Sequence, residues 1–526
     1  MSKRLNWRRT LLSLAAAAMA ATAAAGVEAA TLTVVPQANV TILDPIWTTA
    51  YTARNHGYMI YDTLFGTDEA GKVQPQMVEK WESSPDQRVW TFTLRDGLAF
   101  HDGSSVTSAD VIASLKRWAS RDTMGGTLAR VVESYEAVDD KTFRIKTRDP
   151  YGIMLDALGK PSSNVPFIMP KRIADTPGTE QIKESIGSGP YKFVAAEYKP
   201  GEKVVYVKNE NYKPRAEPAS GTAGGKNVYV DRVEWRIIRD PQTQLNALLS
   251  GEVDVIEQPA FEQYPTLTKS PDIKLVDMQH NGLQYVLRFN HLHPPFNDQK
   301  IRRAALLAMG QSQILRTQVG SQDLITPCRS MYPCGTQYGT EIPGFTGVAD
   351  PAAAKKLLQE AGYDGKPVVL LRPTDLAIVA KLPLVAKQQL EQAGFKVDLQ
   401  TMDWQSLVAR RARRDAPDAG GWNIFMTSFA AEDLLNPVSM PMMNATGATG
   451  FFGWQDDPAL EKIKSNFVQA TTVEEKKSLA AEAQARAFEA VSHVPLGQFH
   501  NPAAARKNIN GLLPAGVQVY WNVRKD

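Results

Sequence analysis

The sequence predicts an α/β protein with more than one lobe, built on mixed sheets that helices cover. The chain has 526 residues, more than one hydrophobic core usually serves, which favours two or three lobes. Short alternating strands mark its first part, whereas helices alternate with strands in its later part. We therefore expect a β-rich early lobe and an α/β later lobe in one chain.

The early part begins with a strand and a helix. "TLTVVPQ" from Thr31 predicts the first strand, and "ARNHGYMIYDTLF" from Ala53 predicts an amphipathic helix. Alternating apolar residues predict further strands at 140–150, 203–210 and 228–238. The C-terminal stretch 511–523, "GLLPAGVQVYWNV", is also strand-like.

Two later segments resemble each other and predict successive αβ units. "AKKLLQEAGY" (354–363) and "AKQQLEQAGF" (386–395) each predict a helix that a glycine closes and a strand follows. A further helix is expected at 470–490. Helices that alternate with strands favour a parallel or mixed sheet.

The stretch 95–111, "RDGLAFHDGSSVTSADV", has two interpretations. His101 with a nearby serine and Asp102 or Asp110 contains the residue types of a hydrolase. The same residues also form turns and helix caps, since "VWTFTL" before them alternates as a strand does and Thr107 with Asp110 resembles a capping box. We favour the strand, hairpin and helix start.

The N-terminal residues 1–29 are predicted to be a secretory signal peptide. Lys3, Arg4, Arg8 and Arg9 precede an alanine-rich apolar run with a small-residue cleavage site after it. Whether the general secretory or the twin-arginine route is used stays open, and no cysteine near the cleavage site invites a lipid anchor.

Charge argues against a nucleic-acid partner. Residues 1–29 carry four positive charges and one negative, so their removal reduces the formal net charge of +3 to zero. A nucleic-acid binder needs a net basic surface. The run "RRARR" (410–414) is interpreted as the solvated face of a helix whose other side carries Leu407 and Val408.

The cysteine and histidine patterns predict one disulfide and do not favour a metal site. Cys328 and Cys334 are the two cysteines of the chain, and in an exported protein we expect them to form one disulfide. His291 and His293 are interpreted as loop residues before a proline turn rather than metal ligands. The segments "GTAGGKN" and "IGSGP" lack the spacing of a phosphate-binding loop and of a nucleophile elbow.

Five stretches together resemble family 5 of the bacterial extracellular solute-binding proteins, the peptide and nickel class that serves ABC importers. Each is a weak pattern alone, but they occur in the family's order across nearly the whole mature chain. They are 95–111, "GSGPYKF" (187–193), "NALLSGEVDVI" (246–256), "RFNHLHPPFNDQKIRRAALLAM" (288–309) and "AAKKLLQEAGY" (353–363).

The resemblance implies a two-lobed periplasmic-binding-protein fold with mixed sheets, a hinge and a ligand cleft between the lobes. By the order of these motifs, the first lobe would be discontinuous and comprise 30–66, 186–283 and 490–526. An extra domain would be inserted at 67–185, and the second lobe would span 284–489.

The resemblance also implies ligand-binding residues. Peptide-binding members hold the ligand's free amine with an acid just after a Trp or Phe, which here corresponds to Phe429 followed by Glu432 or Asp433. Trp404 matches an aromatic pocket wall and Thr49 a polar lining position of the first lobe. Arg372 is the expected partner of a ligand carboxylate.

Met426 stands where similar oligopeptide binders carry a pocket arginine, which leaves the substrate open. The expected function is a periplasmic receptor that delivers a peptide-like solute to an ABC importer permease in the inner membrane. We expect a monomer without a cofactor or a metal. The alternatives are a receptor for an oligosaccharide, opine or metal chelate and, more remotely, a secreted hydrolase.

Overall fold

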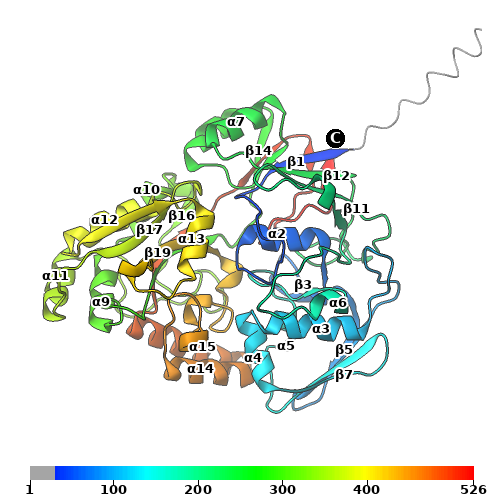
Figure 1. Cartoon of the computed structure of the whole chain (residues 1–526), viewed down its shortest axis with the longest axis horizontal. Coiled ribbons are helices and arrows are strands. Elements are labelled where there is room, and N and C mark those ends of the chain that lie inside the picture. Colours follow the sequence, from blue (N-terminus) through cyan, green and yellow to red (C-terminus); the bar gives the residue numbers. More distant parts are fainter. Residues whose placement is uncertain (1–29) are drawn as a thin grey trace, which may run out of the picture.

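The structure is a computed structural model that describes residues 30–526 of the chain. Its three larger sheets and their covering helices confirm the predicted α/β class with mixed sheets (Figure 1). The signal peptide predicted for residues 1–29 lies outside the described residues. No helix among residues 30–526 is long and apolar enough to cross a membrane.

The first sheet has seven strands in the order β10-β11-β12-β1-β13-β21-β14. Strand β1 lies parallel to both β12 and β13, and the other pairs are antiparallel. The apolar residues of β1 are fully buried, as expected for a central strand that is covered on both faces. The strands are β1 Thr31–Val35, β10 Tyr191–Phe193, β11 Lys203–Lys208, β12 Arg232–Arg236, β13 Val255–Ile256, β14 Ile273–Val276 and β21 Ala503–Arg506.

The second sheet has six strands in the order β16-β20-β15-β19-β17-β18. All seven residues of its central strand β15 are buried. Strands β17, β18 and β19 run parallel to one another, and the remaining pairs are antiparallel. The strands are β15 Leu283–Phe289, β16 Ile325–Thr326, β17 Val368–Pro373, β18 Val397–Met402, β19 Ile424–Ala430 and β20 His493–Phe499.

The two predicted αβ units are confirmed in this sheet. Helix α11, Pro351–Glu360, precedes β17, and helix α12, Leu382–Gln392, precedes β18. Gly362 and Gly394 follow the helices with φ of 71° and 98°, a left-handed conformation that favours glycine.

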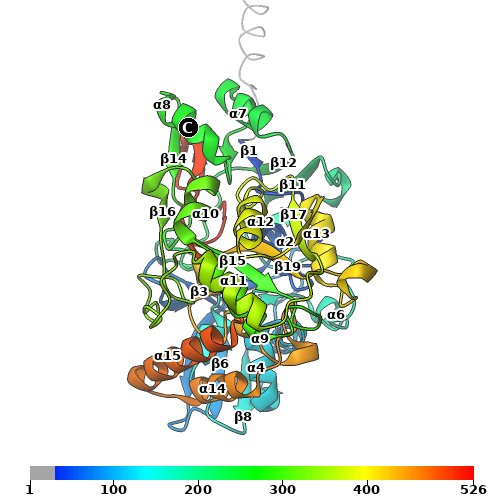
Figure 2. The ribbon, with the colours of Figure 1, turned by 90° about the vertical axis from the view of Figure 1, so that its left-hand side faces the viewer.

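The third sheet, β5-β6-β8-β7, contains the predicted strand "VWTFTL" as β6, Val89–Leu94. Gly97 and Gly103 turn the chain with positive φ, and Thr107 and Asp110 form the predicted capping box of helix α3, Ser108–Ala119. Figure 2 shows this sheet beside helices α14 and α15, and Lys476 of α15 donates to the backbone oxygen of Gly152. The other strands are β5 Val78–Ser83, β7 Val132–Ala137 and β8 Thr142–Thr147.

The smaller elements complete the layers. Helix α2, Tyr51–Ile60, confirms only the first part of the amphipathic helix expected over 53–65, since β2 and β3 follow it and residues 52–60 are buried on all sides. Helix α15, Val473–Ala490, confirms the helix expected at 470–490. The others are α4 Thr123–Val131, α5 Met154–Leu158, α6 Lys171–Ala174, α7 Pro241–Ser250, α8 Tyr264–Lys269, α9 Gln299–Ala308, α10 Gln311–Gln318, α13 Trp404–Arg411, α14 Pro458–Gln469, β2 Asp62–Thr63, β3 Phe65–Thr67, β4 Val73–Pro75, β9 Phe167–Ile168, β22 Ile509–Asn510 and β23 Arg524–Lys525.

The strand expected within 511–523 is wrong. The segment has no strand, although Val517, Val519, Tyr520 and Trp521 are fully buried. The apolar residues are buried beside the first sheet, where the hydroxyl of Tyr520 donates to Glu257 Oε1 at 2.6 Å. Burial is continuous from Ala515 to Trp521 rather than alternating, so these residues pack into the core without forming a strand.

The predicted disulfide between Cys328 and Cys334 is present. It closes a loop next to the second sheet, where Gln311 both donates to the backbone oxygen of Cys328 and accepts from its backbone nitrogen.

The chain crosses between the two large sheets at 277–282, from β14 to β15, and at 500–502, from β20 to β21. All strands of the first sheet lie within the three segments proposed for the first lobe, but β20, which lies in the segment 490–526, pairs in the second sheet. The division of the chain into lobes stays a prediction. We call 277–282 and 500–502 the hinge segments.

One ion pair links the hinge segments and predicts a pH-dependent stability. His500 Nδ1 lies 2.9 Å from Asp277 Oδ2. This hydrogen bond raises the pKa of His500, against the lowering effect of burial. A raised pKa in the folded state stabilises the protein below the unfolded value of about 6.5, and that stability is lost as pH rises through the folded value.

Replacing His500 by Gln should therefore lower the melting temperature at pH 6 and leave it nearly unchanged at pH 9. Because both side chains are about a third exposed, we expect a loss below about 1 kcal/mol. Thermal unfolding of both proteins at the two pH values measures this. An equal loss at both pH values would show that the contribution of His500 does not depend on its charge.

Candidate functional site

A small cavity lies between the two large sheets. Its volume of about 40 Å³ holds a few water molecules at most, well below the size of a usual ligand site. Gln37 and Ala38 follow the carboxyl end of β1, and Leu376 and Ile378 follow that of β17, the edge at which α/β sheets place ligands. The other lining residues are Thr49, Ala50, Tyr51, Thr52, Trp404, Arg411, Thr427, Ser428 and Phe429.

The cavity is small because groups from its two walls contact each other directly. The hydroxyl of Tyr51, at the start of α2, donates to Asp433 Oδ2 at 2.6 Å and accepts from the backbone nitrogen of Ala430 at 2.6 Å. Gln405 of α13 likewise donates to the backbone oxygen of Asn39 at 3.2 Å. These contacts join segments more than 350 residues apart in sequence.

Phe429, Trp404 and Thr49, all expected from the sequence, line this cavity together. Phe429 lies near the end of β19, with its ring edge-on to Phe451 at 6.2 Å between centroids. Trp404 begins α13, whose cap is the carboxylate of Asp403. Two aromatic walls and one hydroxyl thus face the same space.

Glu432 and Asp433 follow β19 in the short 3-10 helix η5, Ala431–Asp433. Neither residue lines the cavity itself. Asp433 is 1% exposed, and its Oδ1 has no hydrogen-bond partner within the described residues. Since its Oδ2 accepts from Tyr51, which lines the cavity, Asp433 is the acid that the structure connects to the cavity.

Glu432 points toward a different neighbourhood. Its Oε1 accepts from Asn281 Nδ2 at 3.1 Å, and its side chain packs against Gly516, where an added Cβ would lie 2.6 Å from the carboxyl. Burial raises the pKa of Glu432 to about 7, although the hydrogen bonds to the carboxyl act in the opposite direction. A neutral acid is thus a populated state of this side chain at neutral pH.

Arg411 is a cavity residue that sequence reasoning missed. It is 4% exposed, so the interpretation of "RRARR" as a solvated face is wrong at this position. Leu407 and Arg411 are four residues apart on α13 and therefore share the buried face, and this spacing was the available signal. Tyr51 was also missed, since no local pattern distinguishes it.

Arg372, expected to hold a ligand carboxylate, does not line the cavity. It lies on β17, where its Nε donates to the backbone oxygen of Ala380 at 3.0 Å. Its role stays a prediction. Met426 is fully buried in β19.

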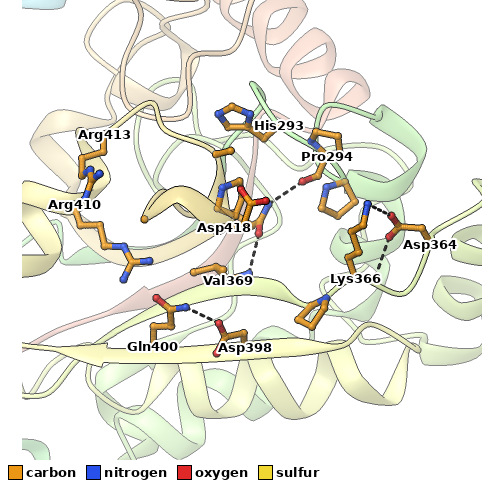
Figure 3. A pocket seen from close by; sticks show the side chains of 16 residues that line it. His293, Pro294, Asp364, Lys366, Val369, Asp398, Gln400, Arg410, Arg413 and Asp418 are labelled. Atoms are coloured by element: carbon orange, nitrogen blue, oxygen red, sulfur yellow. Dashed lines mark hydrogen bonds and ion pairs between the residues drawn. The ribbon is translucent and has the colours of Figure 1, made fainter.

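A larger cavity of about 820 Å³ lies in the predicted second lobe alone (Figure 3). Its lining comes from 293–295, 364–369, 398–400 and 410–423, with no residue of the first sheet. His293 lines it and contacts the backbone oxygen of Arg414, whereas His291 is held elsewhere through its backbone to Gly453. Among residues 30–526 no group of three or more His, Cys, Asp or Glu side chains could hold a metal ion.

His101 has no partner suited to nucleophilic catalysis among the residues described. Its Nδ1 accepts from the backbone nitrogen of Gly187 at 3.3 Å, and its Nε2 lies 3.2 Å from the backbone oxygen of Gly189. Burial lowers its pKa to about 4. Ser104 instead donates to Asp102 at 2.6 Å. His101 thus anchors the hairpin to 187–189.

Known proteins share this architecture. A probable peptide ABC transporter periplasmic-binding protein, y4tO, of Sinorhizobium fredii is 38% identical over 93% of this chain and 92% of its own length. The periplasmic binding protein AgaA of A. tumefaciens R10, solved with agropinic acid, matches with a TM-score of 0.78 at 23% identity over 94% of this chain and 99% of its own.

A dipeptide binding protein of Pseudoalteromonas sp. SM9913, solved with Met-Leu, matches with a TM-score of 0.80 at 20% identity over 94% of this chain and 100% of its own. These likenesses confirm the predicted periplasmic-binding-protein fold. The model of "Bacterial extracellular solute-binding proteins, family 5 Middle" matches residues 72–451. The chain therefore belongs to family 5 of the bacterial extracellular solute-binding proteins.

Proposed function

We propose that the protein is the periplasmic receptor of an ABC importer and captures a peptide-like solute between its two large sheets. The observation that carries this proposal is a cavity whose walls come from both sheets and touch through Tyr51, Asp433 and Ala430. The S. fredii relative, a probable peptide ABC transporter periplasmic-binding protein, supports the solute class. The receptor performs no covalent chemistry.

Binding would proceed by opening and closing about the hinge segments. An open form exposes the wall residues, and a ligand that contacts both walls favours the closed form. Trp404 and Phe429 would flank the ligand, and Thr49 would offer a hydroxyl. Residues 1–29 would direct export without a lipid anchor, and the closed monomer would deliver its solute to an inner-membrane permease.

Mass spectrometry of small molecules released from natively purified protein tests the solute class. A peptide or a derivative of one would support the proposal. A sugar, opine or metal chelate would replace the solute class and leave the receptor function in place.

Ligand binding should stabilise the protein by mass action. At a hundredfold excess over Kd, a ligand that binds only the folded state adds about 2.7 kcal/mol to the free energy of unfolding. We therefore expect a higher melting temperature together with a smaller radius of gyration in small-angle scattering. A ligand that raises the melting temperature but leaves the radius unchanged would contradict closure about the hinge.

The ammonium group of a peptide should pair with Asp433. This carboxylate contacts Tyr51 of the cavity and keeps one oxygen without a partner, so a cation placed there would be desolvated and paired. Truncating one partner of such a pair typically costs about 2 to 5 kcal/mol. Asp433→Asn should therefore weaken peptide binding roughly thirtyfold or more, measured by calorimetric titration.

Glu432→Gln is the matched control, since the neighbouring acid faces Asn281 and Gly516. N-acetylation removes the ammonium charge of the peptide, so it should strongly weaken binding to the wild type. It should weaken binding to Asp433→Asn much less. A coupling energy below about 0.5 kcal/mol in this double cycle would reject the pairing of Asp433 with the ammonium.

The raised pKa of Glu432 predicts a second effect of the control variant. Its folded pKa of about 7 lies above the unfolded value, so the associated stability is present below the unfolded pKa and lost as pH rises through 7. Glu432→Gln should be close to neutral at pH 4 and stabilise the protein by up to about 3 kcal/mol at pH 8.5. Urea unfolding at both values measures this, and a destabilised variant at pH 8.5 would contradict it.

A further inference from the structure

Arg411 differs from the other buried arginines in how few partners it has. Four further arginines among residues 30–526 are at most 7% exposed, and each donates to at least three oxygen acceptors. They are Arg54, Arg117, Arg288 and Arg302. The side chain of Arg411 makes one hydrogen bond within the described chain, to Thr49 Oγ1 at 3.3 Å, and its Nε has none.

The guanidinium of Arg411 nevertheless stays charged. Burial lowers its pKa to about 10, which is still well above neutral pH. Aromatic rings surround it, with its Cζ 4.8 Å from the ring centroid of Phe452, 5.8 Å from that of Phe425 and 5.9 Å from that of Trp404. Ring faces attract a cation weakly, but they do not replace the hydrogen bonds that a guanidinium loses on burial. No carboxylate lies within 4.0 Å of it in residues 30–526.

The charges near the cavity leave Arg411 without a counter-ion. Asp433 accepts a hydrogen bond from the hydroxyl of Tyr51, and the guanidinium of Arg54 stacks over the same Tyr51 ring at 4.1 Å. The other acid, Glu432, carries only part of a negative charge near neutral pH because burial raises its pKa to about 7. An unpaired buried charge is strongly unfavourable, so a site that keeps one is completed by a ligand of opposite charge.

We infer that Arg411 receives a carboxylate of the ligand, which makes the solute an anion or a zwitterion rather than a neutral or purely cationic molecule. This inference rests on the proposed function, because it assigns the second charged group of the solute in the same cavity. A guanidinium presents two parallel N–H donors to a carboxylate, which adds geometric specificity to the charge pairing. Thr49, from the opposite wall, would release its bond to Arg411 and turn to the ligand.

The test uses three variants of the full mature protein. Arg411→Met removes the charge and keeps a long apolar side chain. Arg410→Met is the matched control on the same helix, since Arg410 donates to the backbone oxygen of Gly421 and does not line the small cavity between the two large sheets. Arg372→Met tests the arginine that the sequence analysis expected to bind a ligand carboxylate.

The first arm needs no natural ligand. At constant ionic strength with chloride, sodium acetate at tens of millimolar should raise the melting temperature of the wild type and of Arg410→Met, but not that of Arg411→Met. Without acetate, Arg411→Met should melt at or above the wild-type temperature, because it removes an uncompensated buried charge. A lower melting temperature, or an equal acetate effect in Arg411→Met, would assign Arg411 a structural role and overturn the inference.

The second arm uses alanine di-, tri- and tetrapeptides with a free carboxylate and their C-terminal amides, titrated by calorimetry. The amide should bind the wild type roughly thirtyfold more weakly than the acid, and Arg411→Met should lose this preference. Peptide amides that carry one glutamate distinguish a side-chain carboxylate from the C-terminal one as the bound group.

Loss of the preference in Arg372→Met but not in Arg411→Met would overturn the inference in favour of Arg372. Failure of every peptide to bind the wild type would count against the proposed peptide receptor, whereas the acetate arm would still decide the role of Arg411.

Discussion

The constraint on which the rest of the structure depends is that two sheets, each with strands from distant parts of the chain, are linked by two short adjacent segments. The chain passes between them at 277–282 and 500–502 within residues 30–526, and His500 pairs with Asp277 where the passages meet. Two bodies joined in this way move relative to each other about one axis. The groups on the facing walls are therefore buried or exposed together, which is why we propose the interface between the sheets as the ligand site.

Two polar groups on those walls are only partly hydrogen-bonded. Tyr51 and Asp433 contact each other across the interface, yet Asp433 Oδ1 and Arg411 Nε remain without partners. In the core, by contrast, Lys226 and Asp62 form a fully buried ion pair at 2.7 Å. The partly bonded Asp433 and Arg411 at the small cavity thus differ from this closed ion pair. Binding proteins require this contrast, because a wall satisfied by itself gains nothing when a ligand arrives.

Sequence reasoning succeeded where the determinants are local. The Thr107–Asp110 capping box, the Gly362 and Gly394 helix ends and the short disulfide each depend on neighbours in sequence. It failed for the stretch 511–523, because its apolar residues are buried there by packing against a distant part of the chain and not by strand pairing. Arg411 was missed because a cluster of arginines resembles a solvated surface, whereas the geometry of one helix turn buries only one member. Tyr51 acts across 382 residues, a separation over which no local pattern acts.

The strand order of the first sheet bears on when the protein is able to fold. Strand β1 comes from the first described residues, whereas β21, between β13 and β14, comes from 503–506. Until β21 arrives, β13 and β14 have no bond to each other, and the sheet stays in two pieces with open edges. Long-range pairing of this kind is slow and requires nearly the whole chain. A polypeptide that emerges in N-to-C order is thus unable to complete its first sheet until its last segment is free, so this sheet forms only when synthesis is nearly finished.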